Sequence, residues 1–316
     1  MIGTTTRTAL RAGIPLWLLV FIALIVLPVL SEPFRSANNA NSLMASLAPL
    51  LLVSAGQAVV VLLGGIDLSV GGIVGLGTVL VATPAVPGWV AAVLALAVGV
   101  AAGLVNGLGV LAGVPALVMT LGMSGVLGGI GLLVLAEPGG QVSRGLLAVL
   151  TLQAYPVPLA FVVAVAALAV AWTAVSWTRW GRVVLATGHD PVAARRTGLP
   201  WRSATLRAYA LSGLFSGMAG LAVVARTYSG DSLSGGSLIL DSITVVLIAG
   251  IALTGGQGSV LTVLPAAAVL GLLQNLIVLS GLDSYYQYIV EAVVLVIAVA
   301  LYEASGKRPA FLARGG

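Results

Sequence analysis

Apolar runs, most of them long enough to cross a membrane, follow one another along almost the whole of this 316-residue chain. A helix needs about 20 apolar residues to cross a hydrocarbon core of about 30 Å. Hydrophobic residues make up 59% of the sequence and charged residues only 7%, whereas about a quarter of a soluble domain is charged. That leaves too little polar surface for a water-soluble globule, and the same composition excludes disorder. We predict an all-α polytopic membrane protein with a single transmembrane domain over residues 1–316.

About ten transmembrane helices are expected. The third and eighth candidates are short and flanked by glycine, so we predict that they are broken or re-entrant. The first run could be mistaken for a secretory signal, but it is longer than the usual apolar region of about 7–15 residues, and we expect it to be retained as a span. The candidates are Ile14–Ser31, Leu43–Leu63, Val70–Ala82, Trp89–Leu111, Ala116–Ala136, Val157–Trp177, Ser203–Ala225, Leu240–Leu253, Val260–Leu279 and Tyr286–Tyr302.

Basic residues indicate the orientation of the chain. An even number of spans places both termini on one side, and cytoplasmic loops carry an excess of arginine and lysine. With the termini in the cytoplasm, eleven basic residues lie inside, and three, Arg35, Arg144 and Arg226, lie outside. We therefore expect a multi-pass protein with both termini cytoplasmic. The basic residues behind the net charge of +5 lie mostly at the termini and in one loop. This distribution is typical of membrane orientation, so we expect membrane lipid, and not nucleic acid, as a partner.

Groups needed for catalysis or ion coupling are scarce in the sequence. Lys307 is the only lysine, and no phosphate-binding loop of the form G-x-x-x-x-G-K-[ST] surrounds it. Cysteine is absent and the only histidine, His189, lies in an arginine-rich loop, which leaves a serine nucleophile without a base. Glu291 lies near one end of the last span, whereas ion-coupled carriers bury such groups in mid-membrane. We expect no catalytic residue, cofactor or metal, and a passive pathway driven by another protein.

The arginine-rich loop is predicted to contain a short helix. Asp190 is a good N-cap and Pro191 suits the first helical position. Arg195 and Arg196 fall in the last turn, where cations favour the helix dipole, and Gly198 can take the left-handed closing position. The result is a capped helix of about two turns outside the bilayer, too short to be stable alone. Its spacing fits equally a loop that fixes orientation and a docking helix for a cytoplasmic partner.

Glycine spacing predicts tight packing between helices. Gly99, Gly103 and Gly107 recur every four residues, and Gly213 and Gly217 have the same spacing. Small residues at this spacing form a smooth face that lets neighbouring backbones approach closely. We therefore expect a packed bundle of helices.

Six polar side chains stand within or between the apolar runs. A buried amide without a partner costs several kcal/mol, so each of these side chains needs a hydrogen-bond partner or water. Bonds between helices and a hydrophilic lining for a solute are the two interpretations. For Asp67, the alternative to solute contact is a cap at the start of the following helix. The candidates for a substrate pathway are Gln57, Asp67, Asn106, Thr120, Gln274 and Asn275.

Several motifs follow one another along the chain: Leu63–Gly71, Asn106-Gly107 with Val114–Gly122, the loop Gly181–Gly198, Ala208–Gly213 and Gly255–Ser259. In this order they resemble the motifs of ribose-type permeases of ATP-binding-cassette (ABC) sugar importers. The resemblance covers about residues 43–302, and its first motif is fairly specific. Departures at Ile239–Asp241, Ala249–Leu253 and Glu291-Ala292 leave open which sugar is carried.

The resemblance implies the ten-helix fold of type II ABC importers and a non-catalytic permease subunit in the bacterial cytoplasmic membrane. The partners it implies are a second permease chain, identical or different, cytoplasmic ATPase subunits, and an extracytoplasmic binding protein that delivers a monosaccharide. Nucleosides and branched-chain amino acids are alternative substrates, although the Gly65–Gly71 motif argues against the latter. An ion-coupled secondary carrier and a membrane enzyme are alternatives of other classes.

The resemblance also assigns a role to residues 178–202. This segment would be the cytoplasmic coupling loop, which the ATPase subunits push as they close. The residues implied to contact the ATPase are Gly181, Arg182, Gly188, Asp190, Ala193, Ala194, Arg195, Arg196 and Gly198.

Overall fold

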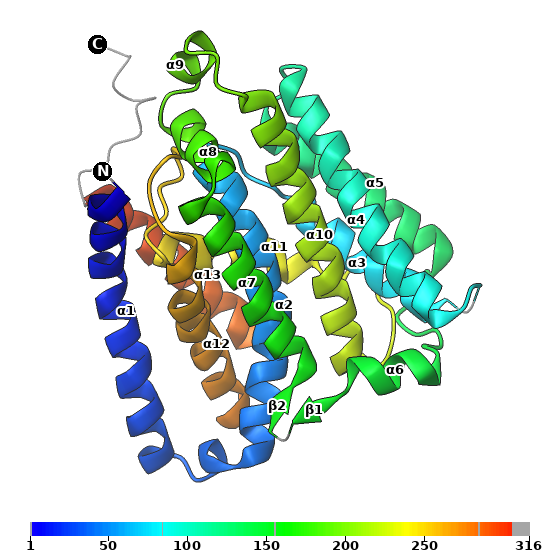
Figure 1. The fold of residues 1–316 in the computed structure, drawn as a ribbon. Helices are drawn as coiled ribbons and strands as arrows, with labels where there is room; N and C mark the ends of the chain where they lie inside the picture. Colours follow the sequence, from blue (N-terminus) through cyan, green and yellow to red (C-terminus); the bar gives the residue numbers. More distant parts are fainter. Residues whose placement is uncertain (1, 84, 155, 284, 305–316) are drawn as a thin grey trace.

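The computed structural model describes residues 2–304 except 84, 155 and 284, and it is a bundle of helices (Figure 1). Six of the described helices are long and apolar enough to cross a membrane, and four more are shorter apolar helices. Together they match the ten predicted runs in number and order, which confirms the all-α polytopic class. These helices are α1 (Ile2–Leu30), α2 (Ala37–Leu62), α3 (Val70–Ala82), α4 (Gly88–Leu111), α5 (Ala116–Val134), α7 (Leu159–Trp177), α10 (Trp201–Thr227), α11 (Gly236–Ile248), α12 (Val263–Leu279) and α13 (Tyr285–Ala304).

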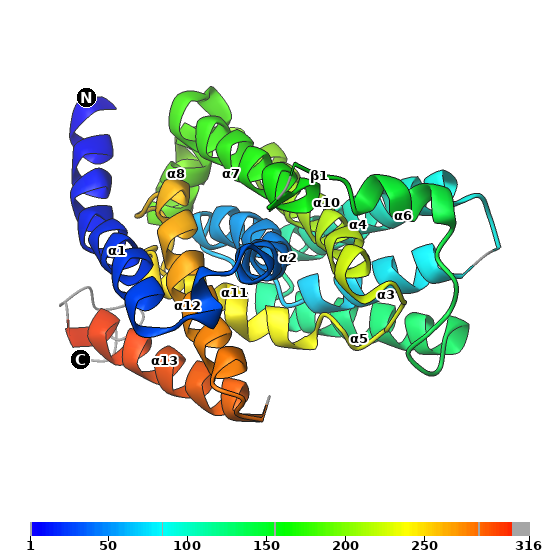
Figure 2. The same cartoon turned by 90° about the horizontal axis from the view of Figure 1, so that it is seen from below.

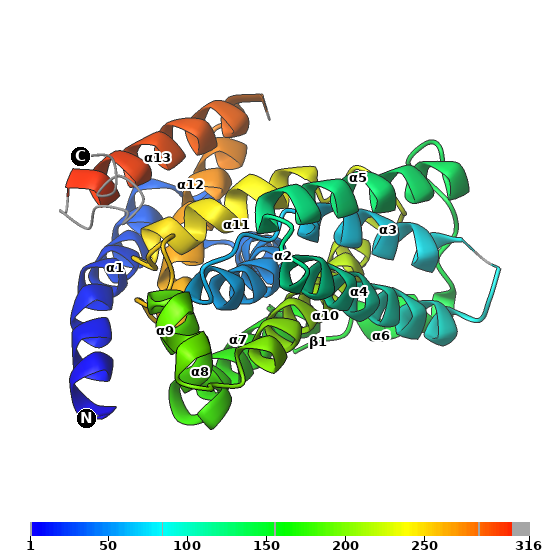
Figure 3. The same cartoon turned by 90° about the horizontal axis from the view of Figure 1, so that it is seen from above.

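Short elements mark the two ends of the bundle. At one end lie α8 (Arg179–His189) and α9 (Pro191–Arg196), together with the start of α1; we call it the α8–α9 end (Figures 1 and 3). The opposite end, here the hairpin end, carries α6 (Arg144–Leu150) and the antiparallel pair β1 (Gln153–Ala154) and β2 (Val157–Pro158) (Figures 1 and 2). The sequence reasoning did not predict α6 or the hairpin. Two 3-10 turns, η1 (Pro33–Arg35) and η2 (Val260–Thr262), complete the described elements.

Helix α2 forms the core of the molecule. Every residue from Leu47 to Leu62 is buried, and α2 contacts α7, α10, α11 and α12. Seen from the hairpin end, α2 lies at the centre with these helices around it (Figure 2). A helix that is apolar on all sides is stable only where neighbours cover every face. The almost uniformly apolar sequence of α2 therefore determines its central position.

The glycine-spaced faces pack α4 against α10, which confirms the predicted close helix packing and identifies the two partners. A Cβ atom built on Gly213 would lie 2.0 Å from the carbonyl oxygen of Gly99, and one on Gly103 would lie 2.2 Å from that of Tyr209. Only glycine lets two helix backbones come this close. This face therefore holds α4 and α10 together within the chain.

The third and eighth spans are helices too short to cross a bilayer by themselves. Non-helical backbone next to them makes up the remaining length. A 13-residue helix such as α3 extends about 20 Å, less than the apolar core of a bilayer. Ahead of α3, residues 64–69 return into the bundle, and Asp67 and Ser69 are fully buried there. Such backbone is tolerated at membrane depth only when protein surrounds it.

The predicted bounds of the eighth span are wrong. Instead of Leu240–Leu253, α11 runs from Gly236 to Ile248. The helix ends because Gly250 has a φ of +73°, which takes the backbone out of the right-handed helical region. Hydropathy could not locate this end, because the residues after it are as apolar as those before it.

Other spans also begin earlier than predicted, and α1 starts at Ile2 and not at Ile14. Ser36 accepts a hydrogen bond from the backbone amide of Asn39 at 3.1 Å and caps α2, so the helix starts at Ala37 and not at Leu43. Helix α10 starts at Trp201, directly after Pro200. A capping side chain sets the first residue of α2, whereas α10 begins after Pro200 without a side-chain cap.

Candidate functional site

The loop 178–202 contains two helices at the α8–α9 end. Thr178 begins α8 by accepting a hydrogen bond from the Gly181 amide at 3.1 Å. Asp190 begins α9 by accepting from the amides of Val192 and Ala193, both at 2.9 Å. The predicted N-cap is thus confirmed, and α9 covers Pro191–Arg196. The sequence reasoning missed α8, whose polar and apolar residues fall on opposite faces.

Gly198 closes α9 in the left-handed conformation predicted for it, with a φ of +70°. The amides of Gly198 and Leu199 donate back to the carbonyl oxygens of Arg195 and Ala194. This pattern satisfies acceptors that the end of a helix would otherwise leave unpaired. The six-residue helix α9 is therefore capped at both ends, by Asp190 at its start and by Gly198 after its last turn.

The predicted ATPase-contacting residues divide into a buried and an exposed set. Gly181, Gly188 and Ala194 are buried and hold α8 and α9 against the bundle, whereas the other six are exposed. The guanidinium carbon of Arg195 lies 4.5 Å from the ring centroid of Trp201, a contact that orients the cation. The exposed residues are Arg182, Asp190, Ala193, Arg195, Arg196 and Gly198. Their role in coupling stays a prediction.

Asp190 keeps its charge well into the acid range. Hydrogen bonds, first from the backbone amide of Ala193 and also from that of Val192, hold the pKa of this carboxyl below its ordinary value of 3.8. Its position at the start of α9 also places the charge at the positive end of the helix dipole. The cap is therefore ionised at any pH near neutrality.

The end of α8 touches two other segments through bare backbone. A Cβ atom on Gly188 would lie 2.0 Å from the Leu62 carbonyl oxygen and 2.6 Å from the Gly256 nitrogen. The Gly256 amide in turn donates to the Leu62 carbonyl at 2.8 Å. The loop that connects α11 with η2 also meets the end of α8, since a Cβ atom on Gly256 would lie 2.6 Å from the His189 nitrogen. The end of α8, which leads directly into α9, is therefore packed against the end of α2 and against this loop.

Three predicted pathway residues come together in a buried polar cluster around the segment 64–69. Asp67 accepts hydrogen bonds from the amide and hydroxyl of Ser69, at 3.0 and 2.6 Å, and from the hydroxyl of Ser212 on α10 at 2.7 Å. Asn106 on α4 donates to Ser69 at 2.8 Å. Thr120 on α5 accepts from the Leu68 amide at 3.0 Å. The cluster ties the segment before α3 to α4, α5 and α10.

Gln57, the fourth predicted pathway residue, is fully buried in α2. Neither polar atom of its amide finds a hydrogen-bond partner among the described residues, and the same holds for the Tyr209 hydroxyl and for Oδ1 of Asn106. Buried polar groups without partners are rare because they lose the hydrogen bonds that water would provide. Whether Gln57 contacts a solute stays a prediction.

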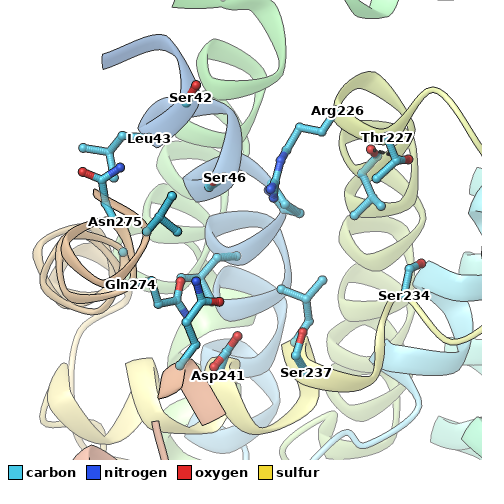
Figure 4. Close-up of a pocket in the computed structure, with 17 residues that line it drawn as sticks. Ser42, Leu43, Ser46, Arg226, Thr227, Ser234, Ser237, Asp241, Gln274 and Asn275 are labelled. Atoms are coloured by element: carbon cyan, nitrogen blue, oxygen red, sulfur yellow. Dashed lines mark hydrogen bonds between the residues drawn. The ribbon is translucent and has the colours of Figure 1, made fainter. Parts of the chain in front are cut away.

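Gln274 and Asn275, the last two predicted pathway residues, line a polar cavity near the hairpin end (Figure 4). The cavity has a volume of about 430 Å³ and lies between α2, α10, α11, α12 and α13. It lies apart from the Asp67 cluster, none of whose members line it. Five of the six pathway candidates therefore fall in two places, the Asp67 cluster and the polar cavity. Gln57 belongs to neither.

The sequence reasoning missed most of the polar residues of this cavity. In the sequence, Arg226 stands out only as a basic residue on the outer side, and Asp241 only as part of a departure from the family pattern. The signal that could have found them is an ionisable residue within an apolar span, which usually faces a bundle interior or a watery cavity. The missed polar residues are Ser42, Ser46, Arg226, Thr227, Ser234, Ser237, Asp241 and Gln287.

Asn275 is held in place on the wall of the cavity. Its amide donates to Oδ1 of Asn39 at 2.8 Å, and the Asn39 amide donates back to Asn275 at 3.3 Å. This reciprocal pair joins the start of α2 to α12. The side chain of Glu291, the acid that the sequence placed in the last span, lies outside the described part of the chain.

The chain is a polytopic membrane protein with a capped helix at one end and a polar cavity toward the other, as a pathway for a solute requires. In agreement with this, residues 39–299 match the family described as permease component of the branched-chain amino acid transport system. The match covers well over half of the chain, which therefore belongs to this family.

Relatives that resemble the chain over most of its length carry the names of sugar permeases. The ribose import permease protein of Escherichia coli (strain K12) is 34% identical over 89% of this chain and 90% of its own length. The fructose import permease protein of Rhizobium meliloti is 32% identical over 92% and 84%, respectively. The galactose/methyl galactoside import permease protein of Escherichia coli (strain K12) is 28% identical over 92% and 93%. No solved structure matches the chain.

Proposed function

We propose that this chain is the permease subunit of an ATP-driven importer that carries a monosaccharide across the bacterial cytoplasmic membrane. Its relatives named for ribose, fructose and galactose import align with most of this chain and of their own length, which favours a sugar over the branched-chain amino acid in the family description. An extracytoplasmic binding protein delivers the sugar, and a second permease chain completes the pathway.

The observation that carries the proposal is the exposed, doubly capped helix α9. Its Arg195 and Arg196 are exposed, and the backbone contact of Gly188 with Leu62 and Gly256 connects α9 to the bundle. We place the α8–α9 end in the cytoplasm because the arginine-rich loop belongs on that side. An ATPase subunit that pushes α9 there moves the helices behind it.

Charge reversal on α9 tests the coupling. In the assembled transporter in vesicles, the double variant Arg195→Glu and Arg196→Glu should lower ATP-dependent sugar uptake about tenfold or more, because repulsion at an interface costs several kcal/mol. Arg144→Glu, at the start of α6 on the opposite end, is the matched control and should leave uptake unchanged. Normal uptake by the double variant, with normal insertion into the membrane, would overturn the coupling role.

The side on which α9 lies can be measured separately. The chain contains no cysteine, so Arg196→Cys creates a single thiol on α9. An impermeant thiol reagent should label it only from the cytoplasmic face. Labelling from outside would reverse the proposed orientation, and sugar uptake by the purified chain in vesicles without an ATPase would identify a secondary carrier instead.

A further inference from the structure

We propose that the cavity between α2, α10, α11, α12 and α13 holds a neutral polyhydroxylated solute inside one permease chain, and that Arg226 orients this solute. The inference rests on the proposed import function and assigns a place to the sugar on its way. The volume of about 430 Å³ lies within the range of about 300–1,000 Å³ that small-molecule sites occupy.

The lining offers side-chain hydrogen-bonding groups that the described part of the chain leaves unused. The side chains of Arg226, Ser42, Ser46 and Ser237 make no hydrogen bond with any described residue. In Figure 4 the Arg226 side chain extends from α10 toward α2, across the cavity. A guanidinium presents five donors in a planar fork, which can reach two neighbouring hydroxyl oxygens at once. Serine hydroxyls both donate and accept, as the hydroxyls of a sugar require.

The charges of the lining favour a neutral solute. Arg226 supplies one positive charge and Asp241 one negative charge, and the side chains of Asp241 and Gln274 face one another in Figure 4. An anionic solute attracted to Arg226 would meet the like charge of Asp241, and such a juxtaposition is costly. A polyhydroxylated solute, in contrast, can donate to the carboxylate and accept from the guanidinium.

The lining also indicates a weak hold on the solute. None of the described residues that line the cavity is aromatic, so no ring face is available to bury the apolar face of a sugar. Each hydrogen bond to the solute replaces one to water, so its net gain is small. A loose site of this kind lets a solute enter from a binding protein and leave again.

Protection of introduced thiols tests the site in the assembled transporter. Ser46→Cys and Ser237→Cys place thiols on α2 and α11 within the cavity, and Ser280→Cys, exposed after the end of α12, is the control outside it. A polar thiol reagent is added from outside with D-ribose, D-fructose or D-galactose. At least one sugar should slow labelling of both cavity thiols about fivefold when present at about four times its dissociation constant. Labelling of the control should not change.

Variants of Arg226 test its orienting role in the same assay. Combined with Ser46→Cys, Arg226→Gln should abolish protection by the sugar, and Arg226→Lys should retain part of it because the charge stays and the fork is lost. Arg144→Gln is the matched arginine control and should retain full protection. Full protection with Arg226→Gln would overturn the role of this residue.

The outcomes separate the site from the function. If the unmodified transporter imports a sugar that protects neither cavity thiol, the site proposal is wrong and the proposed function stands. If no sugar is imported under any condition, the proposed function fails. D-gluconate is the anionic probe, and protection by gluconate alone would overturn the assignment of a neutral solute.

Discussion

Gly188, at the end of α8, packs its Cα against the carbonyl oxygen of Leu62 at the end of α2. A side chain of even one carbon at position 188 would lie 2.0 Å from that oxygen, far inside van der Waals contact. The same carbonyl accepts the Gly256 amide at 2.8 Å, so three chain segments meet at a single backbone oxygen. Packed backbone is stiff, and we propose that this junction transmits a displacement because no side-chain rotation can absorb it.

We expect Gly188→Ala to damage this junction. The new Cβ must displace either α2 or the loop at Gly256, and overpacking of this kind costs about 1–3 kcal/mol. Thermal unfolding in detergent should show the loss, and ATP-dependent sugar uptake should fall with it. Gly145→Ala on α6 is the control, because its Cβ would meet open space. A Gly188→Ala variant with unchanged uptake would contradict the transmitting role of the junction.

Replacement of Asp67 should destabilise the segment before α3. Asp67→Ala removes the acceptor of three hydrogen bonds, and we expect the free energy of unfolding to fall by about 3 kcal/mol. Ser212→Ala removes one of these bonds and should cost about 1–2 kcal/mol. Ser280→Ala, whose exposed hydroxyl bonds only its own helix, is the control. Equal stability of Asp67→Ala and the unmodified protein would show that the cluster does not hold the segment.

A residue larger than glycine at position 213 should push α4 and α10 apart. A Cβ there would lie 2.0 Å from the Gly99 carbonyl oxygen, so Gly213→Ala should lower the free energy of unfolding by about 1–3 kcal/mol. Gly125→Ala on α5 should be tolerated, since its Cβ would meet nothing within 4 Å. The comparison of the two unfolding midpoints measures the effect, and an equal loss in both would argue against a specific contact.

The order of α9 should depend on pH only in strongly acidic solution. The pKa of Asp190 is lowered in the folded chain from its ordinary value of 3.8. The cap is therefore complete above that value, and it is lost as the pH falls through the lower folded pKa. Hydrogen exchange of the α9 amides, corrected for the intrinsic rate, should show protection at neutral pH and its loss below pH 3.8.

Two variants of Asp190 check the origin of this pH dependence. Asp190→Ala should exchange several-fold faster at neutral pH, because the N-cap acceptor is gone. Asp190→Asn should keep the protection, since asparagine caps as well as aspartate, and should lose the pH dependence. A pH profile of Asp190→Asn identical to that of the unmodified chain would assign the titration to another group.

The sequence by itself determined the features that depend on neighbours along the chain. Hydropathy found the ten apolar segments, and cap residues located α9, because Asp190, Pro191 and Gly198 act on the backbone within a few positions of themselves. Glycine spacing similarly predicted that the faces with Gly99 and Gly213 pack closely against a helix, although not against which one. Each of these signals has a fixed period or offset, so it can be found without knowledge of the fold.

Only the tertiary structure decided which distant residues meet. Arg226, Ser46, Asp241 and Asn275 lie on four different helices, and nothing in their local sequence brings them to one cavity. The end of α11 depended on the backbone angle of Gly250, which hydropathy does not encode. The physical reason is that apolar burial in a membrane bundle is non-directional, and it therefore specifies which segments are helices but not which of their side chains converge.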